Sequence, residues 1–308
     1  MKKIICIGEC ALDIVFRNSQ PVGSMPGGRI VNAAAILARQ GLPVVMASEL
    51  AKGQVGDIIA DFLSQAGVDM SSLDRFTEGL SPIIIYTTDE NGITGATRYE
   101  NYPDECFDIV WPRIDEGDIV VYGGYYALDA RMRPRMSQLL THASERKAIL
   151  VYLPGFLPQQ EPRITRVMPV ILENLEYASM VIARNNDLAT IFGTKDGDKC
   201  YHDHIDFYCR SLISVDPANH MISYYSGKEV TSVEIPENTC QSMMWNAGAV
   251  AGAVDVLYRD EKAADHLEAP DEDFRRAVLG QAAITAEKAS KISHCRLAET
   301  SLISEFIS

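Results

Sequence analysis

Short apolar runs alternate along the chain with longer stretches in which apolar residues recur at helical spacing. Residues 3–8 form a strand-type apolar run that ends at Gly8, and residues 32–40 form a strong helical pattern that stops at Gly41. The same patterns predict further strands at residues 13–17, 43–47, 82–88, 94–99, 118–122, 148–152 and 179–183. They predict further helices at residues 58–66, 133–143, 168–175, 187–192, 247–258 and 273–290.

The order of these elements predicts the fold class. Strands that alternate with helices are typical of βαβ units, in which helices cover both faces of a mostly parallel sheet. Asn91 and Gly92 separate two of the strands and indicate a hairpin, so a small β extension is expected near the N-terminal half. No linker or shift in composition divides the chain, and we therefore expect a single α/β domain over residues 1–308.

Composition and charge argue against several classes of protein. The 308 residues are 47% hydrophobic and 23% charged, as in ordinary globular proteins. The formal net charge of −14 repels phosphate backbones and anionic lipids, so neither a nucleic-acid partner nor a membrane surface is expected. The longest apolar stretch, residues 247–254, is far too short to span a bilayer. Seven scattered cysteines without a Cys-x-x-Cys pair argue against a disulfide framework and indicate a reducing, cytoplasmic environment.

One short segment is rich in residue types that bind metals. It contains Cys200, His202 and His204, and a His-x-His pair with a nearby cysteine can bind zinc. No distant pair of further ligands is evident, so the pattern favours a solvated loop that begins a helix. No metal site is therefore expected here.

The N-terminal region carries a more specific set of motifs. They are Gly8-Glu9, then Asp13, then Gly27-Gly28-Arg29-Ile30-Val31-Asn32. In this order and spacing they resemble the N-terminal signature of ribokinase-like (PfkB) carbohydrate kinases. Residues 37–41, 63–69 and 281–289 resemble later landmarks of the same family, so the resemblance covers nearly the whole chain.

The resemblance implies both a fold and a binding site. The fold would be a ribokinase-like three-layer α/β/α sandwich with a small β lid, approximately residues 13–20 and 82–102, through which two copies could form a homodimer. The sugar would be held by Asp13, Gly27, Gly28 and Asn32. Carboxylate and amide groups match the hydroxyls of a sugar, and glycines let the backbone approach the ring closely. Without the resemblance, the glycines could be only a turn and Asn32 only a helix cap.

The C-terminal half of the signature departs from the family pattern. The family has Asp-Thr-x-Gly-Ala-Gly-Asp before a helix, where Gly-Ala-Gly forms an anion hole and the last Asp is the catalytic base. The segment Trp245-Asn246-Ala247-Gly248 anchors the alignment, which places Cys240, Gln241 and Ser242 at the anion hole and Met243 at the base position. A thioether cannot accept a proton at neutral pH, so no intact catalytic residue is expected.

Other motifs on the phosphate side are altered as well. The family's Asn-x-x-Glu, whose acid orders the magnesium shell, is here Arg184-Asn185-Asn186-Asp187. Asp187 is therefore the remaining candidate for that shell. The phosphate loop has lost both glycines at residues 214–219, Asp-Pro-Asn-x-Arg is altered at residues 153–157, and Gly-x-Asp-x-x-Gly has lost its acid at residues 51–56.

Together these patterns predict a carbohydrate-kinase homologue that binds a sugar or sugar phosphate but has lost ATP-dependent phosphotransfer. In that case no cofactor is expected. One alternative is an active kinase of the ribokinase or fructokinase type, which needs ATP and magnesium and uses an unorthodox base, either Asp187 or an acid brought in by the fold. A third alternative is a structural paralogue that acts only through dimerisation.

Overall fold

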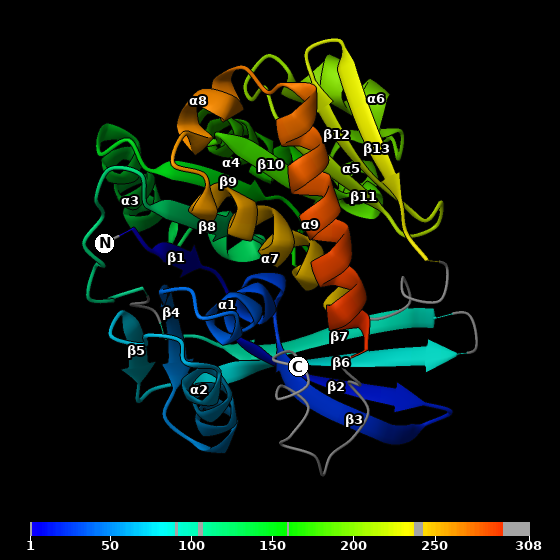
Figure 1. Cartoon of the computed structure of the whole chain (residues 1–308). Coiled ribbons are helices and arrows are strands. Elements are labelled where there is room, and N and C mark those ends of the chain that lie inside the picture. The colour runs from blue at the N-terminus through cyan, green and yellow to red at the C-terminus, as the bar shows by residue number, and fades with distance from the viewer. Residues whose placement is uncertain (1, 90–91, 104–106, 159, 237–242, 292–308) are drawn as a thin grey trace.

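The structure is a computed structural model that describes residues 2–89, 92–103, 107–158, 160–236 and 243–291 (Figure 1). Within these residues the strands are β1 (Ile4–Ile7), β2 (Ala11–Arg17), β3 (Gln20–Gly27), β4 (Val44–Ala51), β5 (Leu73–Phe76), β6 (Leu80–Asp89), β7 (Gly92–Asn101), β8 (Ile119–Gly123), β9 (Ile149–Leu153), β10 (Met180–Arg184), β11 (Leu212–Asp216), β12 (Met221–Ser226) and β13 (Glu229–Glu234). The α-helices are α1 (Arg29–Arg39), α2 (Gln54–Ala66), α3 (Arg133–Glu145), α4 (Ile164–Tyr177), α5 (Asn185–Phe192), α6 (Gly197–Cys200), α7 (Met243–Arg259), α8 (Ala263–Glu268) and α9 (Glu272–Ser290).

Nine strands of the described part of the chain form one large sheet, in the order β13-β12-β11-β10-β9-β8-β1-β4-β5. All pairs from β11 through β5 are parallel, whereas β12 and β13 are antiparallel and form one edge. Every residue of β1 is buried, as expected for a strand of a parallel sheet that is covered on both faces. The predicted α/β class with a mostly parallel sheet is confirmed.

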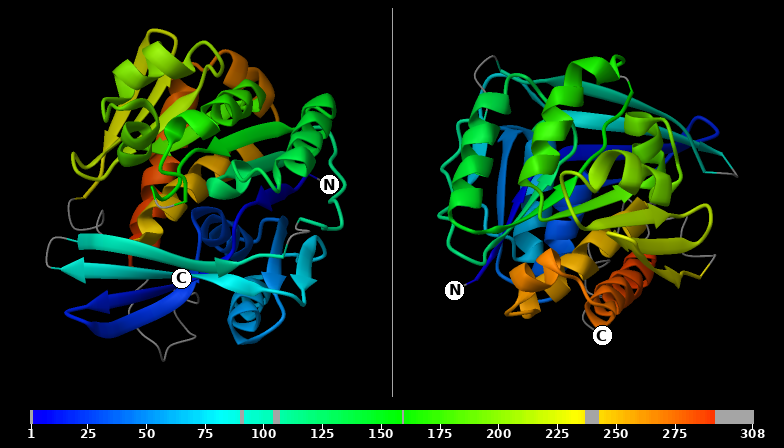
Figure 2. Two further views of the ribbon diagram at one scale, coloured as in Figure 1. Left: turned by 180° about the vertical axis from the view of Figure 1, so that it is seen from behind. Right: turned by 90° about the horizontal axis from the view of Figure 1, so that it is seen from above.

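Helices cover both faces of the large sheet and produce three layers (Figure 2). Helices α1, α2, α7, α8 and α9 lie on one face, and α3, α4 and α5 lie on the other. Successive residues of a strand point to opposite faces. In β1, Ile4 and Cys6 therefore join the core under the first group of helices, while Ile5 and Ile7 join the core under the second.

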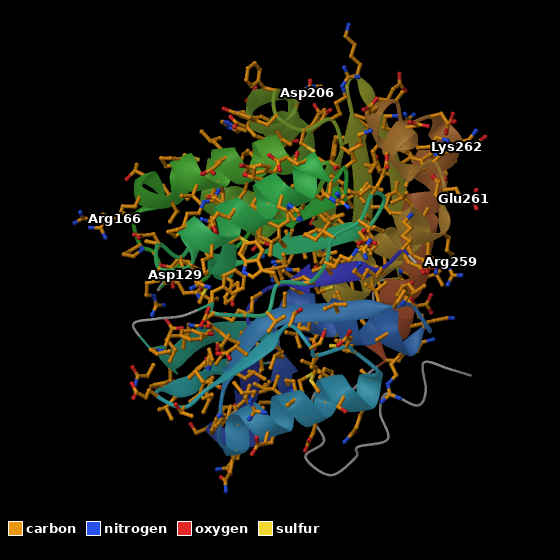
Figure 3. The ribbon with its side chains drawn as sticks, turned by 90° about the vertical axis from the view of Figure 1, so that its left-hand side faces the viewer. Asp129, Arg166, Asp206, Arg259, Glu261 and Lys262 are labelled. Carbon is orange, nitrogen blue, oxygen red and sulfur yellow. The ribbon has the colours of Figure 1, made fainter. Side chains whose placement is uncertain are left out.

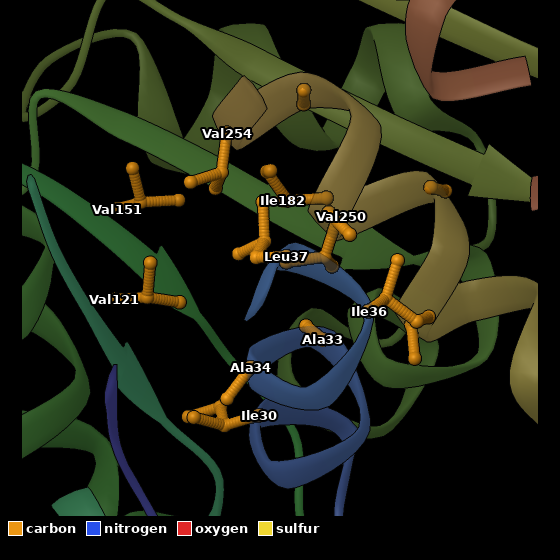
Figure 4. Close-up of a cluster of buried hydrophobic side chains, with 14 of the residues drawn as sticks. Ile30, Ala33, Ala34, Ile36, Leu37, Val121, Val151, Ile182, Val250 and Val254 are labelled. Carbon is orange, nitrogen blue, oxygen red and sulfur yellow. The ribbon is translucent and has the colours of Figure 1, made fainter. Parts of the chain in front are cut away.

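Helix α1 is held between the large sheet and α7 by a cluster of buried aliphatic side chains (Figure 4). Ile30, Ile36 and Leu37 of α1 belong to this cluster, and Val121 of β8 and Val250 of α7 belong to it as well. Burying an aliphatic side chain of this size contributes about 1.5–3 kcal/mol. The packing fixes the position of α1, and thereby of its N-terminus at Arg29.

A second sheet has the strand order β3-β2-β6-β7 and lies beside the large one (Figure 1). Strands β2 and β6 are parallel, with Asp13 beside Ile84, and each has an antiparallel hairpin partner. Residues 13–20 and 82–102, expected to form a lid, lie mostly in this sheet together with β3. The sequence did not predict β3 because Pro21 and Pro26 indicate a loop. Proline is tolerated here because β3 is an edge strand.

The predicted secondary structure is confirmed in type for every strand and helix named above, with shifts at their ends. The helix expected at residues 32–40 begins at Arg29, and the one expected at residues 58–66 begins at Gln54. Strands β11, β12 and β13 were missed because their polar residues break up the apolar pattern, as in Ser223 beside Ser232.

Charged side chains lie over the outer surface of the molecule. Arg166, Asp206, Arg259, Glu261 and Lys262 are exposed at its periphery (Figure 3). Among the helices in the described ranges, none is both long enough and apolar enough to cross a bilayer.

Candidate ligand-binding site

A cavity of about 320 Å³ opens where the large sheet meets the smaller one. Its wall includes Gly123 at the end of β8, Leu153 at the end of β9 and Arg184 at the end of β10. Ile84 and Tyr86 of β6 close it from the smaller sheet. In open α/β sheets, ligands bind outside the carboxyl ends of the strands. This cavity has that position and is therefore the candidate site.

The structure brings together three of the residues that the sequence singled out. Asp13 of β2, Gly28 at the start of α1 and Asn32 within α1 all line the cavity. Gly27 lies directly behind Asp13, and a Cβ atom at position 27 would come within 2.1 Å of the Asp13 carboxylate. The glycine therefore makes room for the aspartate.

Several oxygen atoms in this cavity wall lack a partner. Asp13 Oδ1, Asn32 Oδ1 and Asn246 Oδ1 are buried without a hydrogen-bond partner in the described part of the chain. Asp13 and Asn32 are only 4% and 6% exposed. A buried polar group without a partner costs about 1–3 kcal/mol. Three such acceptors around one cavity indicate a ligand that presents hydrogen-bond donors.

The Asp13 carboxyl group has an unusual protonation equilibrium. Burial raises its pKa to about 7, the negative charge of Glu9 adds to the rise, and Arg98 opposes it. Arg98 is held by Glu9, whose Oε2 lies 2.6 Å from Arg98 Nη1. Asp13 is thus protonated in part of the molecules at neutral pH, so this carboxyl group can accept or donate a hydrogen bond.

A cationic cluster forms another part of the wall. Asp187 Oδ2 accepts hydrogen bonds from Arg29 Nη2 at 2.7 Å and from Arg184 Nε at 2.8 Å, and its Oδ1 accepts one from Arg184 Nη2 at 2.6 Å. Burial alone would raise the pKa of Asp187, but the charges and hydrogen bonds of the two arginines outweigh it and lower the pKa to about 2. Asp187 is therefore fully ionised at neutral pH.

The surroundings of Asp187 bear on its expected role in a magnesium shell. Arg29 and Arg184 are among the residues that line the cavity, and Asp187 lies behind them with both oxygens bound to guanidinium groups. Gly155 permits this arrangement because a Cβ there would come within 2.8 Å of the Asp187 carboxylate carbon. Sequence reasoning gave no role to either arginine. For Arg29 the sequence held one signal that could have been used: an arginine at the first position of a helix is unfavourable, because its charge opposes the helix dipole.

The structure tests the remaining sequence candidates only in part. Cys240, Gln241 and Ser242, the degenerate anion hole, lie outside the described residues, and Met243 is the first residue of α7. In the segment expected to be a phosphate loop, the backbone N–H groups of Ala218 and Asn219 both donate to Asp216 Oδ1 at 3.2 Å. These two amides are thus already occupied within the turn.

The histidine-rich segment is arranged around aromatic packing. The ring of His204 stacks on Phe192 with centroids 4.7 Å apart, and Cys200 is fully buried. No group of three metal-ligating side chains is found in the residues that the structure describes.

The backbone at Gly28 packs closely against the backbone of Glu9, and a substitution there tests the cavity wall. Gly28 has φ +108°, and a Cβ there would lie 2.6 Å from the backbone oxygen of Glu9. We expect Gly28→Ala to lower the free energy of unfolding by about 1–3 kcal/mol and to weaken ligand binding by about tenfold or more. Chemical denaturation and calorimetric titration measure the two effects.

Gly41→Ala is the matched control for this variant. Gly41 also has a positive φ, +81°, but a Cβ there meets nothing within 4 Å. It should lose only about 1–2 kcal/mol of stability and keep its affinity. Equal affinities for the two variants would show that the backbone at Gly28 does not approach the ligand.

Comparison with known proteins was made by sequence and by structure. A sequence profile described as pfkB family carbohydrate kinase matches residues 1–206. No curated protein matches the chain significantly.

Three solved structures illustrate the structural similarity. Aminoimidazole riboside kinase from Salmonella enterica, complexed with aminoimidazole riboside and an ATP analog, has 16% identity, 100% of each chain covered and a TM-score of 0.76. A double mutant of fructokinase from Vibrio cholerae O395, bound to fructose, ADP and potassium ion, has 14% identity, 100% of this chain and 99% of that chain covered, and a TM-score of 0.80. A putative ribokinase II from E. coli has 15% identity, the same coverage and a TM-score of 0.70. At such identities the similarity establishes the fold alone.

Proposed function

Because the chain belongs to the pfkB family of carbohydrate kinases, we propose that its cavity binds a carbohydrate and that the protein has lost ATP-dependent phosphotransfer. The observation that carries the proposal is the set of unpartnered acceptors at the cavity, Asp13 Oδ1, Asn32 Oδ1 and Asn246 Oδ1. A sugar presents several hydroxyl donors within the span of one small ring. It can therefore satisfy several of these acceptors at once, which water at a single position could not.

The ligands bound in two structurally similar proteins favour the same ligand class. The fructokinase structure contains fructose, and the riboside kinase structure contains a riboside. Both ligands carry adjacent hydroxyl groups. Asp13, Gly28 and Asn32, which the family signature assigns to the sugar, lie around the one cavity described above.

The loss of phosphotransfer is proposed from the phosphate side. Met243 stands where the family places its catalytic base, and a thioether cannot take the proton of a hydroxyl group. Loss of a positioned general base costs about 10²–10⁴ in rate. The amides of Ala218 and Asn219 are occupied by Asp216, which removes donors that a phosphate loop would offer.

The residues present do not fit a magnesium site at Asp187. Magnesium prefers oxygen ligands in octahedral geometry and is held by carboxylates that face the substrate phosphates. Both oxygens of Asp187 instead accept hydrogen bonds from guanidinium groups, whose positive charges repel a divalent cation. We therefore assign no step to magnesium or ATP in this protein.

An active kinase with an unorthodox base is the second candidate. Asp187, with its pKa lowered to about 2, is a weak base. Asp13 is better suited because it lines the cavity and has a pKa raised to about 7, near the pH at which a general base works best. Turnover that depends on Asp13 would favour this candidate.

Dimerisation through the smaller sheet is also proposed rather than established. Leu80 of β6 and Tyr99 of β7 are 66% and 57% exposed and line the same hollow of the smaller sheet, so a second copy of the chain could cover them together. Light scattering that gives twice the mass of one chain would support it, and the mass of a single chain would remove it.

Binding is tested by a thermal-shift screen of sugars, each with and without Mg·ATP. A ligand that binds the folded state raises the apparent melting temperature. We expect stabilisation by one or more sugars and none by Mg·ATP alone. Stabilisation by Mg·ATP alone would count against the proposed loss of ATP-dependent phosphotransfer.

A further inference from the structure

The two parts of the cavity wall differ in chemistry. Asp13 and Asn32 present unpartnered oxygen acceptors, which suit the hydroxyl groups of a neutral ligand. Arg29 and Arg184 present guanidinium groups at the same cavity. A neutral sugar has no group that requires two cations. The two guanidiniums therefore indicate a charged group on the ligand, which the oxygen acceptors do not.

The two guanidiniums are fixed in place and remain accessible. Asp187 bridges them through hydrogen bonds of 2.6 to 2.8 Å, so neither side chain has to be ordered when a ligand arrives. Their side chains are 19% and 40% exposed. Apart from Asp187, the acceptor found for them in the described residues is the backbone oxygen of Pro154, 3.4 Å from Arg29 Nη1. A guanidinium has more N–H donors than these bonds use.

The charge balance at this part of the wall is positive. One carboxylate, Asp187, faces two guanidiniums. Arg29 is the first residue of α1, and Arg184 immediately precedes α5, so each stands at the positive end of a helix dipole. Cations are disfavoured at a helix N-terminus, whereas anions bind there. This arrangement gains stability when an anion joins it.

Within the described residues, the other carboxylates on the cavity wall, Glu9 and Asp13, form no hydrogen bond with Arg29 or Arg184. Glu9 bonds to Arg98 of β7 through two hydrogen bonds, and Arg98 also bonds to Glu100. Asp13 is buried, without a cation that bonds to it within the described residues. The two guanidiniums are therefore the groups of this wall whose charge is available to an anionic part of a ligand.

We propose that the ligand is an anionic carbohydrate, with hydroxyl groups on Asp13 and Asn32 and a phosphate or carboxylate on Arg29 and Arg184. This inference rests on the proposed carbohydrate-binding function and narrows its ligand class. Planar guanidiniums bind both phosphate and carboxylate through paired N–H bonds. The volume of about 320 Å³ lies at the small end of ligand pockets, which suits one monosaccharide with its anionic group.

Isothermal titration of matched ligand pairs tests the inference. The pairs are ribose with ribose 5-phosphate, fructose with fructose 6-phosphate, and glucose with gluconate. We expect the anionic member of at least one pair to bind about tenfold or more tightly, with an affinity that falls as salt rises. The first two pairs report phosphate and the third reports carboxylate, so the source of the anion is read directly.

Arg184→Gln assigns the effect to the cluster. It should weaken binding of the preferred anionic sugar by about 10- to 100-fold and of its neutral partner by less than about threefold. Arg166→Gln is the control, because Arg166 is exposed on α4 and does not line the cavity (Figure 3). If Arg184→Gln fails to fold because Asp187 loses a partner, Arg184→Gln with Asp187→Asn removes both charges together and should give the same selective loss.

The outcomes separate this inference from the function on which it rests. Equal affinity within every pair, unaffected by Arg184→Gln, would overturn the anion site and leave carbohydrate binding intact. No binding by any member of the pairs would overturn both. Binding of Mg·ATP that needs Arg184, without binding of an anionic sugar, would assign the arginines to a nucleotide and overturn the inference.

Discussion

Asp13→Asn is expected to stabilise the protein at about pH 8 by about 2–4 kcal/mol and to weaken carbohydrate binding by about 10²-fold. The carboxylate is 4% exposed, and one of its oxygens has no partner in the described residues, so its ionised form is costly in the free protein. Asparagine removes that charge. It also removes the carboxylate, the group that best matches the hydroxyls of a sugar. Residues that bind ligands often reduce stability, so we expect the gain in stability and the loss of binding together.

The pH dependence of this effect has a definite sign. Burial raises the pKa of Asp13 to about 7 in the folded state, above the ordinary value of 3.8. The folded state therefore binds more protons than the unfolded state between these values, and stability falls as the pH rises through this window. Glu49, with a pKa also raised to about 7, contributes to both proteins alike. The difference between parent and variant isolates Asp13.

Urea unfolding at about pH 4 and about pH 8 measures the difference. Asp118→Asn is a matched control, because Asp118 is also buried but accepts hydrogen bonds from Lys3 Nζ at 2.7 Å and from the Asp115 backbone at 2.9 Å. That variant should lose about 1–3 kcal/mol. If Asp13→Asn is destabilised at pH 8 to a similar extent, Asp13 is a satisfied structural group and not a ligand-binding one.

Asp187→Asn is expected to lower the free energy of unfolding at neutral pH by about 1.5–3 kcal/mol, because it removes charge-assisted hydrogen bonds to two partly exposed guanidiniums. The pKa of Asp187 is lowered to about 2 from the ordinary value of 3.8. The ionised form therefore contributes stability that is present above the ordinary value and is lost as the pH falls through the folded-state value. The difference from the parent should be large at neutral pH and shrink as acid is added.

Unfolding at about pH 7 and about pH 3 measures this change, with Glu261→Gln as the control. Glu261 is exposed at the surface (Figure 3), and its variant should stay within about 0.5 kcal/mol of the parent. A different result would support the active kinase: parental stability in Asp187→Asn, together with loss of a magnesium-dependent stabilisation. That combination would make Asp187 a metal ligand.

Much of the fold could be predicted because its signal is local. The apolar run Ile4–Ile7 lies in the centre of a parallel sheet, and such a strand is apolar along its whole length. The helix that stops at Gly41 is similarly marked by periodicity and a turn residue. The ends of elements were less predictable, since the first turn of α1 contains Arg29 and Ile30 directly after two glycines, which themselves indicate a turn.

The candidate site was only partly predictable. Asp13 lies in a strand and Asn32 in a helix, and the hydrophobic pattern does not indicate that the two meet. Only the family resemblance grouped them with Gly28. The sequence could not pair Arg29 with Arg184, because the two residues are 184 − 29 = 155 positions apart. They come together only in the fold, where β10 ends beside the start of α1 and Asp187 bonds to both.

The central claim is that the protein binds a carbohydrate without phosphorylating it, and one assay addresses it directly. The sugar that stabilises the protein most is incubated with Mg·ATP, and formation of ADP and sugar phosphate is followed by phosphorus NMR. We predict sugar binding with no product above the protein-free control. Steady formation of ADP and sugar phosphate above that control would contradict the account and establish an active kinase.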